Sequence, residues 1–263
     1  QTAMSDVAPL LFIAMGVFIF TFIIISFVSI PEPHLRKGKV QKEQHLHSPW
    51  SFRHTVLGVI GIFIYVGIEI GIPGTLNFYL ADSTEKGAGL LTDGAAIGGA
   101  IAAIYWLLML VGRLASSVIS GKVSSRVQLI TVSIVAICFI LIAIITPKEV
   151  TVSMPGYSAD NGFQMASVPL SALFLVLCGL CTSIMWGGIF NLAVEGLGKY
   201  TAQASGIFMM MVVGGGILPL IQQFISDSAG YMNSYWLIIA MLAYLLFYGL
   251  VGCKNVNKDI PVE

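Results

Sequence analysis

The feature that most constrains this chain is a series of long apolar stretches, each of the length needed to cross a lipid bilayer, which takes about 20 mostly apolar residues. They run over residues 7–30, 55–80, 94–120, 127–146, 169–194, 202–226 and 233–252. Charged residues make up 10% of the chain, against about 25% in an average soluble domain, which excludes a soluble fold. Because lipid leaves backbone groups no outside partner, the sequence predicts an all-α polytopic membrane helix bundle with seven transmembrane helices.

Basic residues fall mostly on one side of this predicted bundle. Eleven of the 13 Lys and Arg residues lie in 31–54, in 113–126, at Lys199 and in 254–258. Only Lys86 and Lys148 lie in connections on the opposite side. Positive charge gathers on the cytoplasmic side of membrane proteins, so we expect a multi-pass membrane protein with its amino terminus outside and its carboxy terminus in the cytoplasm.

The spacing of the stretches suggests a division of the chain. We expect residues 1–30 to be the last helix of an amino-terminal bundle, 31–54 a basic cytoplasmic linker, 55–252 a six-helix carboxy-terminal bundle and 253–263 a cytoplasmic tail. The first residues, QTAM, lack a basic region, so no signal peptide is expected and the chain is interpreted as part of a longer protein. Residues 147–168 are expected to form a long outer loop.

The second stretch carries the acidic residue that lies deepest in any predicted span. Glu69 lies about fourteen residues into it, near the bilayer midplane, where a charge costs about 2.5–3.5 kcal/mol on insertion scales. Such a residue normally faces a cavity or a partner. Two interpretations stay open: Glu69 serves a polar binding pocket, or it bonds a neighbouring helix and only stabilises the bundle.

Other polar and aromatic side chains can join Glu69. Tyr65 shares its helix face, with Asn77 at the edge of that face. In later spans, indole and amide groups suit the hydroxyls and C–H faces of a sugar, although Trp186 also suits an interfacial belt. The predicted substrate-binding residues are Glu69, Asn77, Tyr65, Trp186, Asn191 and Gln222.

Small residues and prolines predict points of bending. A glycine and a proline can loosen the second helix just beyond Glu69, and a glycine run followed by proline predicts a kink in the sixth. A single arginine near the end of the third helix suits either gating or anchoring. The predicted gating or hinge residues are Gly71, Pro73, Gly214, Gly215, Pro219 and Arg113.

The sequence offers no enzyme site. No Ser-His-Asp set, phosphate loop or metal-ligand cluster lies within the spans, so neither a catalytic residue, a resident cofactor nor a metal is expected. Cys178 and Cys181 form a C-x-x-C inside an apolar helix without a second ligand pair, which favours packing. The formal net charge is zero and there is no strong basic run, so no nucleic-acid partner is expected.

Several blocks of sequence carry a family resemblance. They are YVGIEIG at 65–71, GRLASSVIS at 112–120, IFNLAVEGLGKYTAQASGIFMMMVVGGGILPL at 189–220 and SDSAG at 226–230. Over nearly all of residues 55–252 the chain resembles the fucose–galactose–glucose:proton symporter family of the major facilitator superfamily, as its carboxy-terminal half with helices six to twelve.

This resemblance implies uptake of fucose, galactose or glucose across the inner membrane by cation symport with alternating access. Its implied partners are the sugar, the lipid bilayer and an amino-terminal half, where the family's main proton-handling carboxylates lie. Glu69 matches the family's acidic or amide position, and the coupling ion is left open between H⁺ and Na⁺. A seven-helix receptor and a channel remain alternatives from topology alone. The receptor is disfavoured because 233–252 contains no lysine for retinal and no cysteine suits an outer disulfide.

Overall fold

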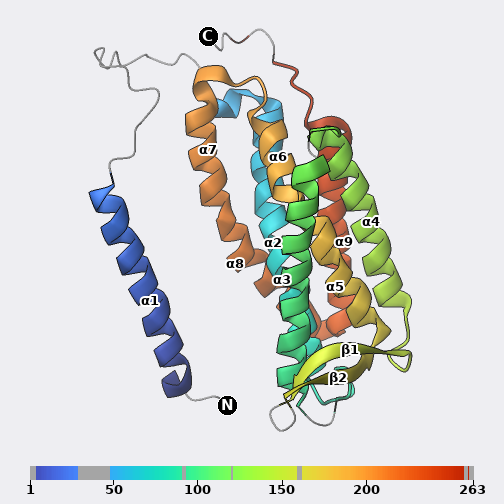
Figure 1. Ribbon diagram of the computed structural model, residues 1–263. Coiled ribbons are helices and arrows are strands. Elements are labelled where there is room, and N and C mark those ends of the chain that lie inside the picture. Colours follow the sequence, from blue (N-terminus) through green and yellow to red (C-terminus); the bar gives the residue numbers. More distant parts are fainter. Residues whose placement is uncertain are drawn as a thin grey trace. The chain divides into compact units, whose positions relative to one another are not determined.

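The computed structural model describes residues 4–28, 48–90, 93–119, 121–158, 162–257 and 260. It divides the chain into two units, Gln1–His45 and Leu46–Glu263. In the first unit, helix α1 (Met4–Phe27) is one continuous helix (Figure 1). Its described apolar side chains are mostly exposed. The Thr21 and Ser26 hydroxyls donate to the carbonyls four residues before them, which satisfies polar groups that would otherwise face apolar surroundings.

The second unit contains the remaining long helices. They are α2 (Arg53–Ala81), α3 (Gly94–Ile119), α4 (Ser125–Ile145), α5 (Leu170–Thr182), α6 (Met185–Val194), α7 (Thr201–Met210), α8 (Gly214–Ala229) and α9 (Tyr231–Phe247). Within the described residues they make six segments long and apolar enough to cross a membrane, and α1 adds a shorter apolar helix over Leu11–Phe27. The predicted all-α polytopic fold is confirmed. The predicted domain boundaries stay predictions; α2 begins at Arg53, and residues 29–47 lie outside the described part.

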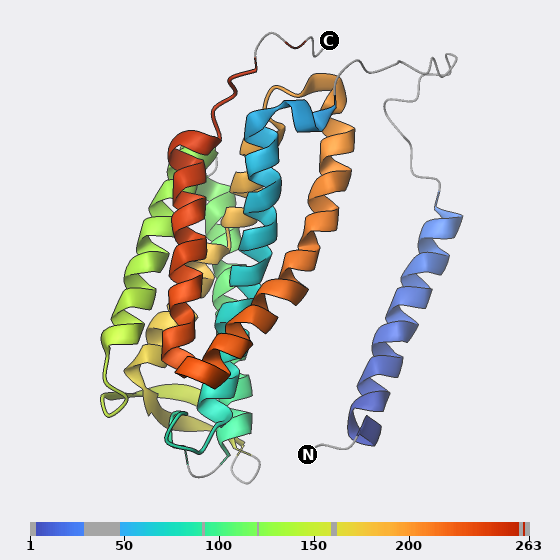
Figure 2. The same ribbon diagram turned by 180° about the vertical axis from the view of Figure 1, so that it is seen from behind.

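Two of the predicted spans are interrupted. A 3₁₀ turn, Met211–Val213, separates α7 from α8 directly before the glycine run, where the sequence predicts a kink. Figures 1 and 2 show the bend between these two orange helices. The break between α5 and α6 has no such signal. There the Ser183 hydroxyl donates to the Leu180 carbonyl at 2.6 Å, a local bond that competes with regular helix geometry.

Residues 147–168, expected to form a long loop, contain two strands that the sequence analysis does not predict. Strands β1 (Thr151–Ser158) and β2 (Gly162–Pro169) pair antiparallel as a hairpin, with Ser158 opposite Gly162. Met154 and Val168 are buried, and Gly156 of β1 packs close to Ile97 of α3. Short alternating segments of this kind carry a weaker sequence signal than a long apolar helix. The formation of these two strands therefore depends on their packing against α3.

Helix α2 lies at the centre of the second unit, packed against α3, α6, α8 and α9. Figures 1 and 2 show α7 and α8 along one side, α4 along the other and the hairpin across one end, here called the hairpin end. The opposite end, where α2 starts and residues 253–257 follow α9, is called the tail end. Two buried tyrosines bind this part of the chain to α2. Tyr235 of α9 donates to the Ile72 carbonyl at 2.9 Å, and Tyr248, in the π-helical turn that follows α9, donates to the His54 carbonyl at 3.3 Å.

Candidate transport site

The centre of the candidate site is an ion pair between α2 and α3. Arg113 Nη2 lies 3.3 Å from Glu69 Oε1, and the side chains are 54% and 13% exposed respectively. The pair therefore joins two consecutive long helices of the second unit through their deepest charged side chains. Opposite charges inside apolar helices compensate each other's desolvation, and they commonly mark the path of a substrate or ion.

Aromatic and sulfur-containing side chains surround this pair. Tyr65, one helical turn before Glu69, is fully buried, and its ring meets the Trp186 ring edge-on at 6.0 Å between centroids. Within the described part of the chain, the Tyr65 hydroxyl makes no hydrogen bond of normal geometry. Met109 Sδ, one turn before Arg113 on α3, lies 3.3 Å from Arg113 Nη2. The pair therefore has an apolar aromatic wall and an uncommitted hydroxyl beside it.

A cavity of about 440 Å³ opens next to the pair, lined by Arg113, Ser183, Trp186 and Gly187. Pockets for small ligands commonly measure about 300–1,000 Å³. The break between α5 and α6 places Ser183 and Trp186 on this cavity, and Gly187 leaves its wall open, since no atom lies within 4 Å of where its Cβ would be. An indole face, a hydroxyl and a guanidinium in one cavity suit a polyhydroxylated ligand.

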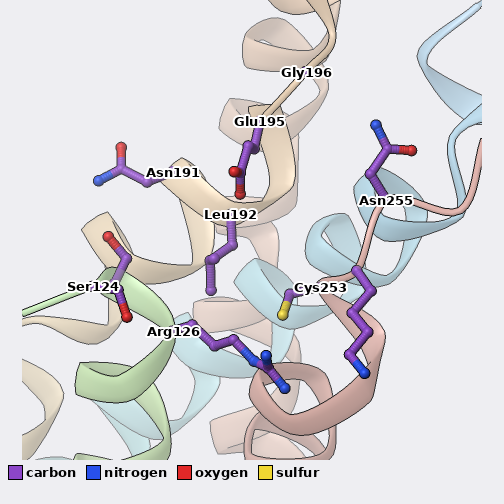
Figure 3. Close-up of a pocket in the computed structure, with 10 residues that line it drawn as sticks. Ser124, Arg126, Asn191, Leu192, Glu195, Gly196, Cys253 and Asn255 are labelled. Carbon is purple, nitrogen blue, oxygen red and sulfur yellow. The ribbon is translucent and has the colours of Figure 1, made fainter. Parts of the chain in front are cut away.

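The structure does not place the remaining predicted binding residues on the 440 Å³ cavity. Asn191 lines the cavity shown in Figure 3 and also a smaller cavity that it shares with Arg113 and Ser183. Asn77 packs against Gly98 of α3, and its buried Oδ1 has no hydrogen-bond partner among the described residues. Gln222 is fully buried beside Gly71, with Nε2 3.5 Å from Ser234 Oγ. The structure thus brings Tyr65, Glu69 and Trp186 together around Arg113, and not Asn77 or Gln222; their roles in binding stay predictions.

A family model described as Major Facilitator Superfamily matches residues 6–218. The chain belongs to this superfamily. The glucose/galactose transporter of Brucella abortus is 33% identical over 249 residues, covering 94% of this chain and 53% of the relative. The putative glucose/galactose transporter of Helicobacter pylori is 30% identical over 223 residues, covering 82% and 48%. The L-fucose-proton symporter of Escherichia coli is 36% identical over 73 residues, 28% of this chain and 17% of the relative.

A solved structure supports the fold of this facilitator chain. It is the crystal structure of the major facilitator superfamily transporter FucP in the outward conformation, matched with a TM-score of 0.68 at 19% identity over 92% of this chain and 54% of the other. The chain spans about half the length of the curated relatives it matches. Together these matches confirm the resemblance to the fucose–galactose–glucose:proton symporter family.

The predicted hinge glycines of the facilitator chain lie where α2 and α8 approach each other closely. A Cβ on Gly71 would overlap the Gln222 amide oxygen, one on Gly214 would overlap the Phe63 carbonyl, and one on Gly215 would come within 2.7 Å of Val66. These contacts explain glycine at each position without motion. Helix α2 continues through Pro73, and α8 through Pro219. The proposed bending at these positions stays a prediction.

Sequence reasoning found Glu69 and Arg113 separately but missed their pairing. The available signal was one acidic and one basic residue deep in consecutive spans. Ser116 and Gln128, which line the next cavity towards the tail end, were not predicted from sequence either, because single polar residues in a helix are ordinary. Cys178 and Cys181 are free and buried, and no metal-binding group of three His, Cys, Asp or Glu occurs among the described residues.

Proposed function

We propose that this chain is the carboxy-terminal half of a secondary transporter that takes up a hexose or 6-deoxyhexose by cation symport. Its relatives are named glucose/galactose transporters and an L-fucose-proton symporter, which supports a sugar such as glucose, galactose or fucose. The observation that carries the proposal is the Glu69–Arg113 pair beside a cavity lined by Trp186 and Ser183. The amino-terminal half of the transporter is the proposed partner, and the sugar binds between the halves.

The proposed membrane orientation follows from charge. The tail end of the second unit carries Arg126, Lys199 and Lys254, whereas the hairpin end carries Lys86 and Lys148 with several acids. This distribution supports a cytoplasmic tail end in an inner membrane. In that orientation the 440 Å³ cavity faces the proposed sugar site between the two halves. Alternating access would open this site first to one side of the membrane and then to the other.

The ion pair gives the cation a means of changing the site. With Glu69 ionised, Arg113 is held by the carboxylate at 3.3 Å. A proton or Na⁺ on Glu69 cancels the charge that holds Arg113, so the guanidinium becomes available to sugar hydroxyls. Its five N–H donors suit neighbouring hydroxyl groups. Sugar binding then favours the cation-loaded form, and cation binding favours the sugar-loaded form by the same factor, which is the reciprocity that symport requires.

The aromatic wall supplies the other half of sugar recognition. Trp186 lines the cavity and Tyr65 stands behind it, in an edge-on contact that limits rotation of the indole. A rigid aromatic face against the C–H face of a sugar ring loses little side-chain entropy on binding. Arg113 and Ser183 then contact hydroxyl groups at the ring edge.

The test uses the full-length transporter that contains this chain, reconstituted in liposomes. We expect Glu69→Gln to lower gradient-driven uptake of labelled sugar at least tenfold, because the neutral amide leaves Arg113 without its counter-charge and cannot take up the cation. Glu149→Gln, an exposed acid between α4 and β1, is the matched control and should retain uptake. Normal uptake by Glu69→Gln rejects the role of the pair. If the wild-type protein carries none of fucose, galactose and glucose, the proposed substrate class is wrong.

A further inference from the structure

At the hairpin end, an apolar groove of about 600 Å³ lies between α3 and the hairpin, and it is here called the α3 groove. Its hairpin wall is the aromatic pair Tyr157 and Phe163. Among the described residues, no atom lies within 4 Å of a Cβ added at Gly99, so this half leaves the groove unfilled. Besides Ile104 and Leu107, the α3 residues that line the groove are small: Ala95, Ala96, Gly99, Ala100 and Ala103.

The aromatic wall of the groove is fixed to α3. Tyr157 and Phe163 lie directly opposite each other on β1 and β2, and their rings meet edge-on at 5.4 Å between centroids. The Ser158 hydroxyl next to them donates to the carboxylate of Asp93, the residue directly before α3, and Figure 1 shows the hairpin across this end of α3. Tyr157 is nevertheless 42% exposed and Phe163 87% exposed. Exposed apolar side chains gathered in one patch mark an interaction surface.

The exposed face of α3 changes in size along the helix. Towards the tail end it carries large side chains, which are Leu107, Leu110, Leu114 and Val118. At the hairpin end, small residues recur every four positions at Ala95, Gly99 and Ala103. Small residues at this spacing let a second membrane helix approach closely. A helix that crosses α3 in the groove therefore lies close to it at the hairpin end and diverges from it towards the tail end.

The position of Arg113 indicates where that second helix comes from. Ala95 and Arg113 lie about five turns apart in α3, at about 3.6 residues per turn, so they lie on the same face of the helix. Arg113 lines the 440 Å³ cavity at the proposed sugar site between the halves. The groove therefore lies on the side proposed to meet the amino-terminal half. The chain covers 53% of its Brucella abortus relative, so a segment of similar length is available to supply an apolar helix.

We propose that a transmembrane helix of the amino-terminal half fills the α3 groove, with the Tyr157–Phe163 pair over its outer end, and that this contact closes the sugar site at the hairpin end. This inference rests on the proposed function. A site between two halves reaches the outside only when the halves separate at that end. Sugar entry therefore requires the helix to leave the groove, and closure behind the sugar requires it to return.

A side chain placed in the groove tests this closure in the full-length transporter. Gly99→Leu fills the space that the second helix needs, and the space around Gly99 accepts the side chain without a clash in this half. We expect sugar uptake and the exchange of labelled for unlabelled sugar to fall about tenfold or more, because both require closure. The Kd for sugar should stay within about threefold of wild type, because the site stays open to the outside.

Cys138→Leu is the matched control for Gly99→Leu. It also enlarges a small exposed residue in the apolar part of a helix, but on α4 and away from the groove, and it should retain uptake. Uptake by Gly99→Leu equal to that of this control overturns the proposal.

The aromatic pair is tested by a substitution on the hairpin alone. Phe163→Ala should lower uptake about threefold or more, because the outer end of the helix loses its cover. Met165→Ala is the matched control, since Met165 lies on the same strand, is 63% exposed and does not line the groove. Equal uptake by these two variants overturns the role of the aromatic pair in closure.

A nitroxide spin label identifies the occupant of the groove without transport. In full-length protein whose other reactive cysteines are replaced by serine, a label on Gly99→Cys should be immobile and should collide with dissolved oxygen about threefold less often than a label on Cys138, because a helix covers it. Collisions as frequent as at Cys138 mean that lipid fills the groove. Spectral broadening that disappears on dilution with unlabelled protein means that a second copy fills it. Either result overturns the proposal.

The label also separates this inference from the proposed function. An immobile, oxygen-shielded label at position 99, in a protein that carries none of fucose, galactose and glucose, counts against the proposed sugar transport, while the docking of a helix in the groove stands.

Discussion

Substitution of Gly214 tests the packing that holds α2 in place. Gly214 is the first residue of α8 and is buried against α2. A Cβ at this position would overlap the carbonyl oxygen of Phe63 and lie 2.8 Å from its carbonyl carbon and 3.0 Å from its Cα. These are backbone atoms of a central helix, so no side-chain rotation relieves the contact. Gly214→Ala therefore forces the two helices apart.

The magnitude follows from that geometry. Non-bonded carbon atoms pack at about 3.5 Å or more, so the helices must separate by at least about 0.7 Å to clear the Phe63 carbonyl carbon, and by more to clear its oxygen. Overpacking of this kind costs roughly 1–3 kcal/mol. Gly216, two residues later, is the matched control because no atom lies within 4 Å of its added Cβ. Gly216→Ala should gain up to about 1 kcal/mol of helix stability, so the two variants should differ by about 1–4 kcal/mol.

The assay is unfolding of the chain in mixed micelles by increasing dodecyl sulfate, followed by far-ultraviolet circular dichroism. We expect the Gly214→Ala transition at lower detergent fraction than wild type and the Gly216→Ala transition at the same or higher fraction. Equal stability of the two variants would contradict close packing of α8 on α2. It would also leave the glycine at 214 without a packing explanation and favour the hinge interpretation.

Two further predictions concern the ends of the spans. Arg126→Ala should lower the free energy of unfolding by about 1–3 kcal/mol and speed amide exchange after α9, because two charged hydrogen bonds to the Gly249 and Leu250 carbonyls are lost. Arg126→Lys should restore only part of this stability. Amide exchange at the wild-type rate in both variants would contradict a stabilising role for these two bonds. The Asp82 carboxylate accepts from the Thr84 backbone N–H at 2.8 Å, which lowers the pKa of Asp82, so this bond stabilises the loop above the unfolded-state pKa and is lost as the pH falls through the lower folded-state pKa. A carboxyl titration by nuclear magnetic resonance should give a pKa below about 3.9, and a value at or above it would contradict the bond.

Apolar length and pattern were enough to predict the helices of this chain, because lipid permits few other backbone structures. They were not enough for the hairpin at 151–169, whose strands are short and depend on burial against α3. The break between α5 and α6 was also hidden, since Ser183 is an ordinary residue in a transmembrane helix. Its effect comes from the space that Gly112 leaves for it on the neighbouring helix.

The sequence by itself determined that the chain is a membrane bundle. It also determined that Glu69, an acid at membrane depth, needs a compensating partner or a cavity, because the free-energy cost of a buried charge depends on its depth and not on the details of packing. Only the tertiary structure decided that Arg113 is its partner and that Trp186 and Ser183 share its cavity, while Gln222 lies elsewhere. These choices depend on how α2, α3 and α6 rotate and approach one another. That rotation is set by glycine contacts between helices distant in sequence, which a local pattern does not encode.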